Sequence, residues 1–147
     1  MELLKNKNII VMGIRNKKSI AWGIAKRAYE QGAKLILTYE TEKERETIED
    51  LTKNFTNHIL IKCNVADDKQ VETLFKEMKK EVHEIHGIAH CIAHANHSDL
   101  KKNFLNTSRD GFAHSMDVSA YSLVTISQHA KDLMHEGGSI VTLTYYG

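Results

Sequence analysis

The chain has 147 residues, of which 41% are hydrophobic, with a formal net charge of +1 and a mean hydropathy of −0.40. This length suffices for one domain with a buried core, and a near-neutral charge without blocks of like charge argues against a nucleic-acid-binding or membrane-surface protein. No stretch approaches the roughly 18 apolar residues of a membrane span, and the first residues lack the apolar core of a secretory signal, so we expect a cytoplasmic protein.

The first predicted strand, over residues 8–12, leads into a glycine turn and then a helix that begins at Ser19. Gly13 has no Cβ, so the backbone can turn sharply there and a phosphate can approach closely. Ser19 is the predicted N-cap, where its hydroxyl can accept a hydrogen bond from a helix N–H, and the positive end of the helix dipole favours a pyrophosphate. We expect Gly23 to let the helix pack closely against the strand. Because the spacing is not G-x-G-x-x-G, an ordinary capped helix after a buried strand is the alternative.

Strands and helices alternate along the rest of the chain, as hydrophobic period and capping residues indicate. We predict further strands over residues 34–39, 58–63, 87–93 and 139–144. The first predicted helix runs from Ser19 to near Gln31 and ends at Gly32, a typical C′ glycine. The second begins at Thr41, with Glu44 completing a capping box, the third begins at Asp67, and the last runs from Thr107 or Ser108 to about Met134. Residues 94–106 are predicted to form a polar loop.

Apolar residues at helical spacing predict which face of each helix is buried. In the first helix Ile20, Ile24 and Ala28 recur every fourth residue, which indicates a helix. In the last helix the predicted buried residues are Phe112, Met116, Leu123, Ile126 and Leu133.

Five strands alternating with four helices specify an α/β, doubly wound parallel sheet with the Rossmann strand order 3-2-1-4-5. We therefore expect residues 1–147 to form a single dinucleotide-binding domain. In this order Cys63 and Cys91 end strands that are three positions apart, about 14 Å, whereas a disulfide needs Cα atoms within about 7 Å. Both cysteines should be free thiols.

A ligand of this fold lies beyond the carboxyl ends of the strands, at the switch between the first and fourth strands. Glu40 follows the second strand, where a carboxylate can accept hydrogen bonds from the adenosine ribose and repel a 2′-phosphate, favouring NAD over NADP; a solvated glutamate fits equally well. Lys43 and Arg45 lie near enough to weaken that preference. Asn64 and Val65 can bind the adenine edge, and a plain turn after the third strand is equally compatible.

Two further positions are candidates at the other end of the ligand. Ile92 would pass beneath the nicotinamide, although a buried strand residue is the simpler interpretation. Tyr145 follows the last strand, where a phenol can donate a proton or a hydrogen bond to a substrate carbonyl; an exposed surface tyrosine is the alternative.

Histidines recur every few residues in one region, at His83, His86, His90, His94 and His97. Gly87 and the β-branched run after it prevent a single helix from presenting these rings together. Zinc needs three or four convergent ligands, so we expect no metal site.

The chain resembles the enoyl-acyl-carrier-protein reductases of bacterial fatty-acid synthesis, which belong to the short-chain dehydrogenase superfamily. The most specific motif is the glycine–serine segment after the first strand, whose wide spacing departs from the usual dehydrogenase pattern. The residues that carry the resemblance lie at 11–14, 16–25, 32–35, 86–93, 95–96, 99–100, 107–109, 111–112, 119–123 and 136–145, and so span essentially the whole chain.

The resemblance implies a reaction in which NADH transfers a hydride to the β-carbon of a trans-2-enoyl thioester on acyl carrier protein. It implies that the cofactor is contacted by Gly13, Ser19, Ile20, Glu40, Asn64, Val65 and Ile92. It further implies that Ala95 lines the enoyl pocket and that Tyr145 is one of two active-site tyrosines. The full-length family fold would form a homo-oligomer.

Three features depart from the family pattern. Asn64 stands where an aspartate is usual, and His94 replaces an aromatic residue beside the nicotinamide pocket. The family's Tyr-x6-Lys segment belongs on a helix after the fifth strand, and this chain ends before that helix. We therefore expect a fold truncated after strand five, with an open sheet edge, low stability and a tendency to associate. The reductase, a catalytically inactive remnant and a dinucleotide-binding sensor all stay open as functions of the chain.

Overall fold

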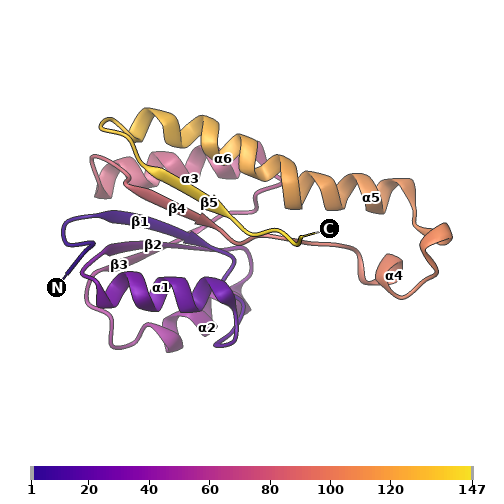
Figure 1. Ribbon diagram of the computed structural model, residues 1–147, viewed down its shortest axis with the longest axis horizontal. Helices are drawn as coiled ribbons and strands as arrows, with labels where there is room; N and C mark the ends of the chain where they lie inside the picture. The colour runs from indigo at the N-terminus through magenta and orange to yellow at the C-terminus, as the bar shows by residue number, and fades with distance from the viewer. Residues whose placement is uncertain (1, 147) are drawn as a thin grey trace.

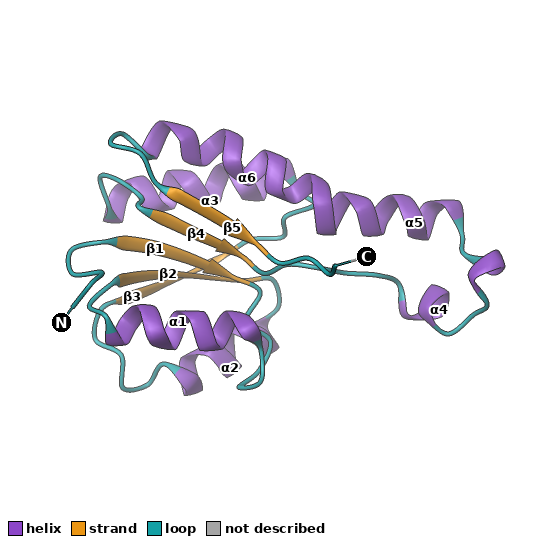
Figure 2. Cartoon of the chain, in the orientation of Figure 1, coloured by secondary structure: helices purple, strands orange, loops and turns teal. Residues whose placement is uncertain are grey.

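A computed structural model describes residues 2–146 of the chain, as a parallel sheet with helices on both faces (Figures 1 and 2). The strands are β1 (Asn8–Met12), β2 (Lys34–Tyr39), β3 (His58–Lys62), β4 (Gly87–His90) and β5 (Ser139–Thr142). The α-helices are α1 (Ile20–Glu30), α2 (Glu42–Leu51), α3 (Asp68–Glu81), α4 (His97–Leu100), α5 (Arg109–Met116) and α6 (Ser122–Ala130). Every strand pair is parallel and the order is β3-β2-β1-β4-β5, which confirms the predicted topology.

The two faces of the sheet are buried under separate pairs of helices. One core cluster joins Ile10 and Met12 of β1 to α3 and α6, and the other joins Val11 of β1 to α1 and α2. Side chains alternate between the faces of a strand, so a strand covered on both sides is apolar at every position. This explains why the runs that predicted β1 and β2 are continuously hydrophobic.

Helix α1 packs on the sheet through a face of small residues, of which the predicted apolar pattern contains only Ala28. The buried positions are Ala21, Ala25 and Ala28, whereas Ile20 is 64% exposed. Gly23 is exposed as well, and a Cβ built on it would meet no atom within 4 Å. The prediction that Gly23 brings the helix close to the strand is therefore wrong. Three alanines one turn apart provide the close approach instead.

The long helix predicted up to Met134 is interrupted. A π-helical turn, η2 (Asp117–Tyr121), separates α5 from α6, and a short 3-10 turn, η3 (Lys131–Leu133), follows α6. Ile126 and Leu133 are buried as predicted, but Phe112 and Met116 are exposed. Figure 1 shows the reason, because α5 extends beyond the sheet toward α4 and so has no strands beneath it.

The segment predicted as a polar loop contains two short helices, α4 and the 3-10 turn η1 (Phe104–Asn106). Strands β3, β4 and β5 also end one to three residues before their predicted ends. The residues beyond the ends of β3 and β4 form loops that line the site described below.

Strand β5 is the edge of the sheet within residues 2–146, where it pairs with β4 alone. All four of its residues are exposed. The expected open edge is therefore confirmed for the described part of the chain.

No helix within residues 2–146 has the length and apolarity needed to cross a bilayer.

Candidate functional site

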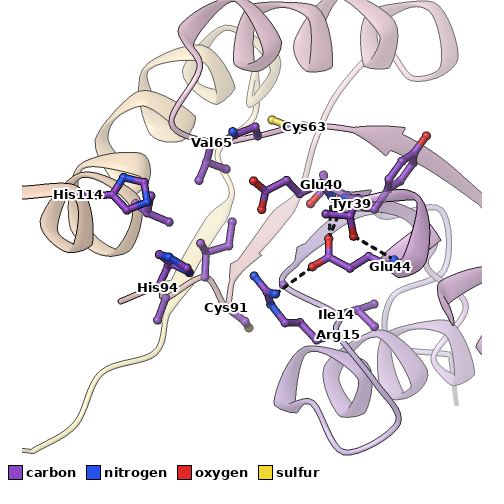
Figure 3. A pocket seen from close by; sticks show the side chains of 17 residues that line it. Ile14, Arg15, Tyr39, Glu40, Glu44, Cys63, Val65, Cys91, His94 and His114 are labelled. Atoms are coloured by element: carbon purple, nitrogen blue, oxygen red, sulfur yellow. Dashed lines mark hydrogen bonds and ion pairs between the residues drawn. The ribbon is translucent and has the colours of Figure 1, made fainter. Parts of the chain in front are cut away.

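A pocket lies at the carboxyl ends of the parallel strands, and its two ends differ in character (Figure 3). Arg15, Glu40 and Glu44 stand at one end, and His94 and His114 stand at the other. The pocket lies where the chain order reverses between β1 and β4, as predicted for a doubly wound sheet. Its lining consists of residues 13–15, 38–41, 44, 63–65, 91–94, 114 and 118.

The turn after β1 forms the floor of this pocket. Gly13 has a φ of +96°, a conformation that side-chain-bearing residues rarely adopt. A Cβ on Gly13 would overlap the carbonyl oxygen of Cys91, which follows β4. The turn is thus pressed against the end of the neighbouring strand, and only glycine satisfies both constraints.

Ser19 occupies the N-cap position of α1, but its hydroxyl does not cap the helix. Its Oγ accepts hydrogen bonds from the backbone N–H groups of Arg15 and Asn16, both at 3.0 Å. The predicted position is confirmed and the predicted hydrogen bond is wrong, because the loop folds back over Ser19. The first turn of α1 consequently carries no side-chain cap, and its N–H groups stay available to an anion.

The capping box predicted at the start of α2 is present. Thr41 Oγ1 accepts from Glu44 N at 3.3 Å, and Glu44 Oε2 accepts from Glu40 N at 2.8 Å and Thr41 N at 3.3 Å. The other carboxylate oxygen of Glu44 lies 3.2 Å from Nη1 of Arg15. Sequence reasoning missed Arg15 because no spacing rule connects the β1 loop to α2.

The turn after β3 uses much of the hydrogen-bonding capacity of Asn64. Asn64 Oδ1 accepts from Ala66 N at 2.9 Å, and Asn64 N donates to Gln70 Oε1 at 2.9 Å. The carboxylate of Asp67 accepts from Lys69 N and Gln70 N at the start of α3. Val65, with its side chain almost fully buried, is the apolar contribution of this turn to the pocket.

Both cysteines line the pocket as free thiols, which confirms that they form no disulfide. Burial, together with the negative charges of Asp67 and Glu40, raises the pKa of Cys63 to about 12. Burial also raises the pKa of Cys91. Because the thiolate is the reactive form, neither group is activated as a nucleophile.

A buried histidine of β4 joins this strand to β5 and to the first residue of α6. His90 Nε2 lies 2.8 Å from Ser122 Oγ, and Nδ1 lies 3.1 Å from Thr142 Oγ1. The Ser122 hydroxyl donates to Val118 O at 2.7 Å, so His90 must donate its Nε2–H to Ser122 and accept from Thr142. Sequence reasoning did not find these partners, because they lie 32 and 52 residues away along the chain.

The π-helical turn also positions the loop after β4. Ser119 Oγ accepts from His94 N at 3.0 Å and donates to His94 O at 3.1 Å. The His94 ring meets the ring of His114 edge to face, with centroids 5.2 Å apart. His114 is a second pocket residue that sequence reasoning missed.

The structure brings most of the predicted site residues together. Those that line the pocket are Gly13, Glu40, Asn64, Val65 and Ile92. Ser19 and Ile20 follow the lining loop, at the start of α1, and half-buried Ala95 follows His94. Tyr145 lies outside the pocket lining with its side chain 98% exposed. Within residues 2–146, no three histidine, cysteine, aspartate or glutamate side chains converge as metal ligands.

Comparison with known proteins finds relatives that all carry the same name, enoyl-acyl-carrier-protein reductase. The family model for "Enoyl-(Acyl carrier protein) reductase" matches residues 13–147. The enoyl-[acyl-carrier-protein] reductase [NADH] FabI of Bacillus subtilis is 48% identical over 98% of this chain, and the [NADPH] FabI of Staphylococcus aureus is 44% identical over 98%. A crystal structure of the Bacillus cereus reductase with NADP+ and indole naphthyridinone superposes with a TM-score of 0.93 at 46% identity, over 99% of this chain.

The chain spans a little over half the length of these relatives. It covers 57% of the Bacillus subtilis and Staphylococcus aureus proteins and 57% of the Bacillus cereus chain. The shared part is the sheet from β1 to β5 with its helices, which includes every loop that lines the pocket.

Replacing Gly13 by alanine tests whether the close approach to Cys91 builds the pocket. We expect Gly13→Ala to destabilise the chain by at least about 2 kcal/mol, since the new Cβ is strained at positive φ and overlaps a carbonyl oxygen. Gly23→Ala is the matched control, which meets no atom and should stabilise the helix by about 0.5–1 kcal/mol. Urea denaturation of both variants measures the difference. Equal effects of the two substitutions on the free energy of unfolding would contradict the structural role of Gly13.

The pH dependence of unfolding tests the neutral state of His90. Burial lowers the pKa of His90, so the folded chain keeps this ring neutral where the unfolded chain, with a histidine pKa of about 6.5, binds a proton. Stability should therefore be complete above about pH 6.5 and fall as the pH is lowered through that value. We expect His90→Gln to flatten this decline in urea midpoints between pH 7 and 5. The exposed His83→Gln is the control, and an equally flattened slope there would exclude His90 as the cause.

Proposed function

Since the chain belongs to the enoyl-(acyl carrier protein) reductase family, we propose that it binds NADH in the pocket at the carboxyl ends of its strands. We propose further that the hydride serves to reduce a trans-2-enoyl thioester carried on acyl carrier protein. The observation that carries the proposal is the Gly13 turn, which leaves the backbone bare beside the uncapped first turn of α1. A pyrophosphate fits there because backbone N–H groups and the helix dipole favour negative charge.

Each part of the dinucleotide has a proposed set of contacts. Gly13, Ser19 and Ile20 receive the phosphates, with Ile20 presenting its backbone N–H at the start of α1, whereas the N–H of Ser19 already donates to Asn16 O at 3.0 Å. Asn64 and Val65 flank the adenine, and Val65 supplies an apolar surface there. Ile92 lies beneath the nicotinamide, near the His94 end of the pocket.

The chemistry needs hydride donation and a group that stabilises the developing enolate. When bound, NADH would supply the hydride to the β-carbon of the enoyl thioester, and the resulting enolate would take up a proton from water at its α-carbon to give the saturated acyl chain. We assign to Tyr145 the donation of a hydrogen bond from its phenol to the thioester carbonyl oxygen. Its exposed side chain, just past the end of β5, is free of other contacts that would compete for the phenol. Ala95, after His94, lines the space for the acyl chain.

Glu40 is the residue we assign to the choice between NADH and NADPH. Figure 3 shows its carboxylate pointing into the pocket beside Glu44 and Arg15. A carboxylate there accepts hydrogen bonds from the ribose hydroxyls and repels a 2′-phosphate. The family includes relatives named for each cofactor, so membership of the family does not decide between NADH and NADPH, and we assign the choice to residues of this chain.

A dinucleotide-binding module without turnover is the second candidate. The positions of the proposed residues support it, because most of the proposed cofactor contacts line the pocket whereas Tyr145, the proposed catalytic residue, lies outside the lining. Both candidates share the same NADH site and differ in whether an enoyl thioester reacts there.

We also propose a cytoplasmic location and, for the full-length family fold, a homo-oligomeric assembly. Assembly is supported by apolar side chains on the outer face of α5 and α6 and on β5, which expose Phe112, Met116, Val124, Ile140 and Val141. Surfaces of this kind are typical of protein interfaces.

One assay separates the two candidates. The chain is titrated with NADH by fluorescence, and oxidation of NADH is then followed with a crotonyl thioester. Saturable binding with thioester-dependent oxidation supports the reductase, and binding without oxidation supports the module. Failure to bind NADH by a folded chain would overturn both.

The cofactor preference is tested by Glu40→Gln. We expect this variant to raise the affinity for NADPH relative to NADH by about five- to tenfold, because one repelling charge is removed near the 2′-position. Glu42→Gln is the matched control, since Glu42 lies two residues away on α2 but outside the pocket lining. An unchanged affinity ratio in Glu40→Gln would remove Glu40 from this role.

A further inference from the structure

We propose that Glu44 is a second specificity-determining residue, because it holds the Arg15 guanidinium and so withholds it from the 2′-phosphate of NADPH. The inference rests on the proposed function, since it assumes that the adenosine ribose lies beside Glu40. It concerns the ion pair between the β1 loop and α2, which the cofactor contacts proposed above do not use.

Arg15 is the one lysine or arginine among the residues described as lining the pocket. Its backbone is fixed by the hydrogen bond from its N–H to Ser19 Oγ, while its side chain is 59% exposed. A guanidinium with this freedom can reach a phosphate at the edge of the pocket, and it is well suited to bind one through paired N–H groups.

Glu44 is held far more firmly than its partner. Its side chain is 14% exposed, and one carboxylate oxygen accepts from the backbone N–H groups of Glu40 and Thr41. The other oxygen faces Arg15 at 3.2 Å. The carboxylate is thus fixed by the start of α2, and Arg15 is drawn to it (Figure 3).

The balance of charge at this end of the pocket follows from the pair. The charge of Glu44 balances that of Arg15, so the carboxylate of Glu40 gives this end of the pocket one net negative charge. A 2′-phosphate would meet this excess charge and would have to displace Glu44 from Arg15 to gain a partner. Removing the charge of Glu44 would instead leave a free guanidinium opposite Glu40.

Glu44→Gln is a clean substitution for the test. Glutamine at this position of a capping box still accepts hydrogen bonds from the two backbone N–H groups, so α2 keeps its cap while the ion pair is lost. The position of the Arg15 backbone depends on Ser19 and is independent of Glu44. Glu46→Gln, an exposed change on the same helix and outside the pocket lining, is the matched control.

The experiment compares ADP-ribose with 2′-phospho-ADP-ribose, which differ only at the 2′-position, by calorimetry on the 147-residue chain. We expect Glu44→Gln to tighten binding of 2′-phospho-ADP-ribose by about tenfold and to leave that of ADP-ribose unchanged. In an Arg15→Gln background the same substitution should gain no more than about twofold, because the freed guanidinium is missing. Glu46→Gln should change neither affinity.

Three results would overturn the inference or its premise. An equal gain with and without Arg15 would show that Glu44 acts only as a repelling charge, and no gain at all would show that Arg15 does not bind the 2′-phosphate. Either result leaves ADP-ribose binding, and with it the proposed cofactor site, intact. Absence of ADP-ribose binding by the unmodified, folded chain would instead remove the proposed function itself.

A second measurement needs no variant. The Arg15 side-chain Nε–H resonance of the unmodified chain should shift equally with ADP-ribose and with 2′-phospho-ADP-ribose, since Glu44 retains the guanidinium in both complexes. A larger shift with the 2′-phosphorylated ligand would show that Arg15 already binds the phosphate, and would contradict the role of Glu44.

Discussion

The turn at Gly13 is pressed against the carbonyl of Cys91, and the site depends on this contact. It ties the end of β1 to the end of β4, the neighbouring parallel strands at which the order of the strands across the sheet reverses. Because a side chain would fill the space between these two ends, the bare backbone is what keeps the pocket open. The same turn places the β1 loop so that Ser19 can fold it back and leave the start of α1 without a side-chain cap. Packing of two strand ends therefore determines where an anion can approach a helix.

The two ends of the pocket are built by different kinds of interaction. At the Glu40 end, the capping box of α2 fixes the carboxylate of Glu44, and this carboxylate also forms an ion pair with Arg15 of the β1 loop. At the His94 end, the π-helical turn between α5 and α6 reaches the loop after β4 through Ser119. His90 of β4 joins Ser122, the first residue of α6, to Thr142 of β5. The extra residue of a π-turn is a common device at functional sites, because it breaks the regular hydrogen-bond ladder of the helix. Here it turns Ser119 and Ser122 toward the sheet.

Much of the fold follows from local signals, and much of the site does not. Continuous apolar runs, the Thr41 box and the positive-φ Gly32 after α1 predict the order of elements correctly, since each acts within a few residues. Ala21 and Ala25 on the buried face of α1 lie outside the predicted apolar pattern, because close packing selects small alanines over isoleucines and hydrophobicity alone does not express that preference. Phe112 and Met116 were placed in the core because periodicity cannot show that α5 extends past the sheet. Arg15 and the partners of His90 are contacts between distant segments, for which one sequence contains no spacing rule.

The central claim is that the Gly13 turn and the start of α1 bind the phosphates of a dinucleotide. It is tested most directly by amide chemical-shift perturbation when ADP-ribose is added to the isotopically labelled chain. The account predicts that the largest shifts fall on residues 13–20, with further shifts at Glu40 and Val65. Shifts confined to the outer face of α1, around the apolar groove formed by Leu4 and Ile24, would contradict it.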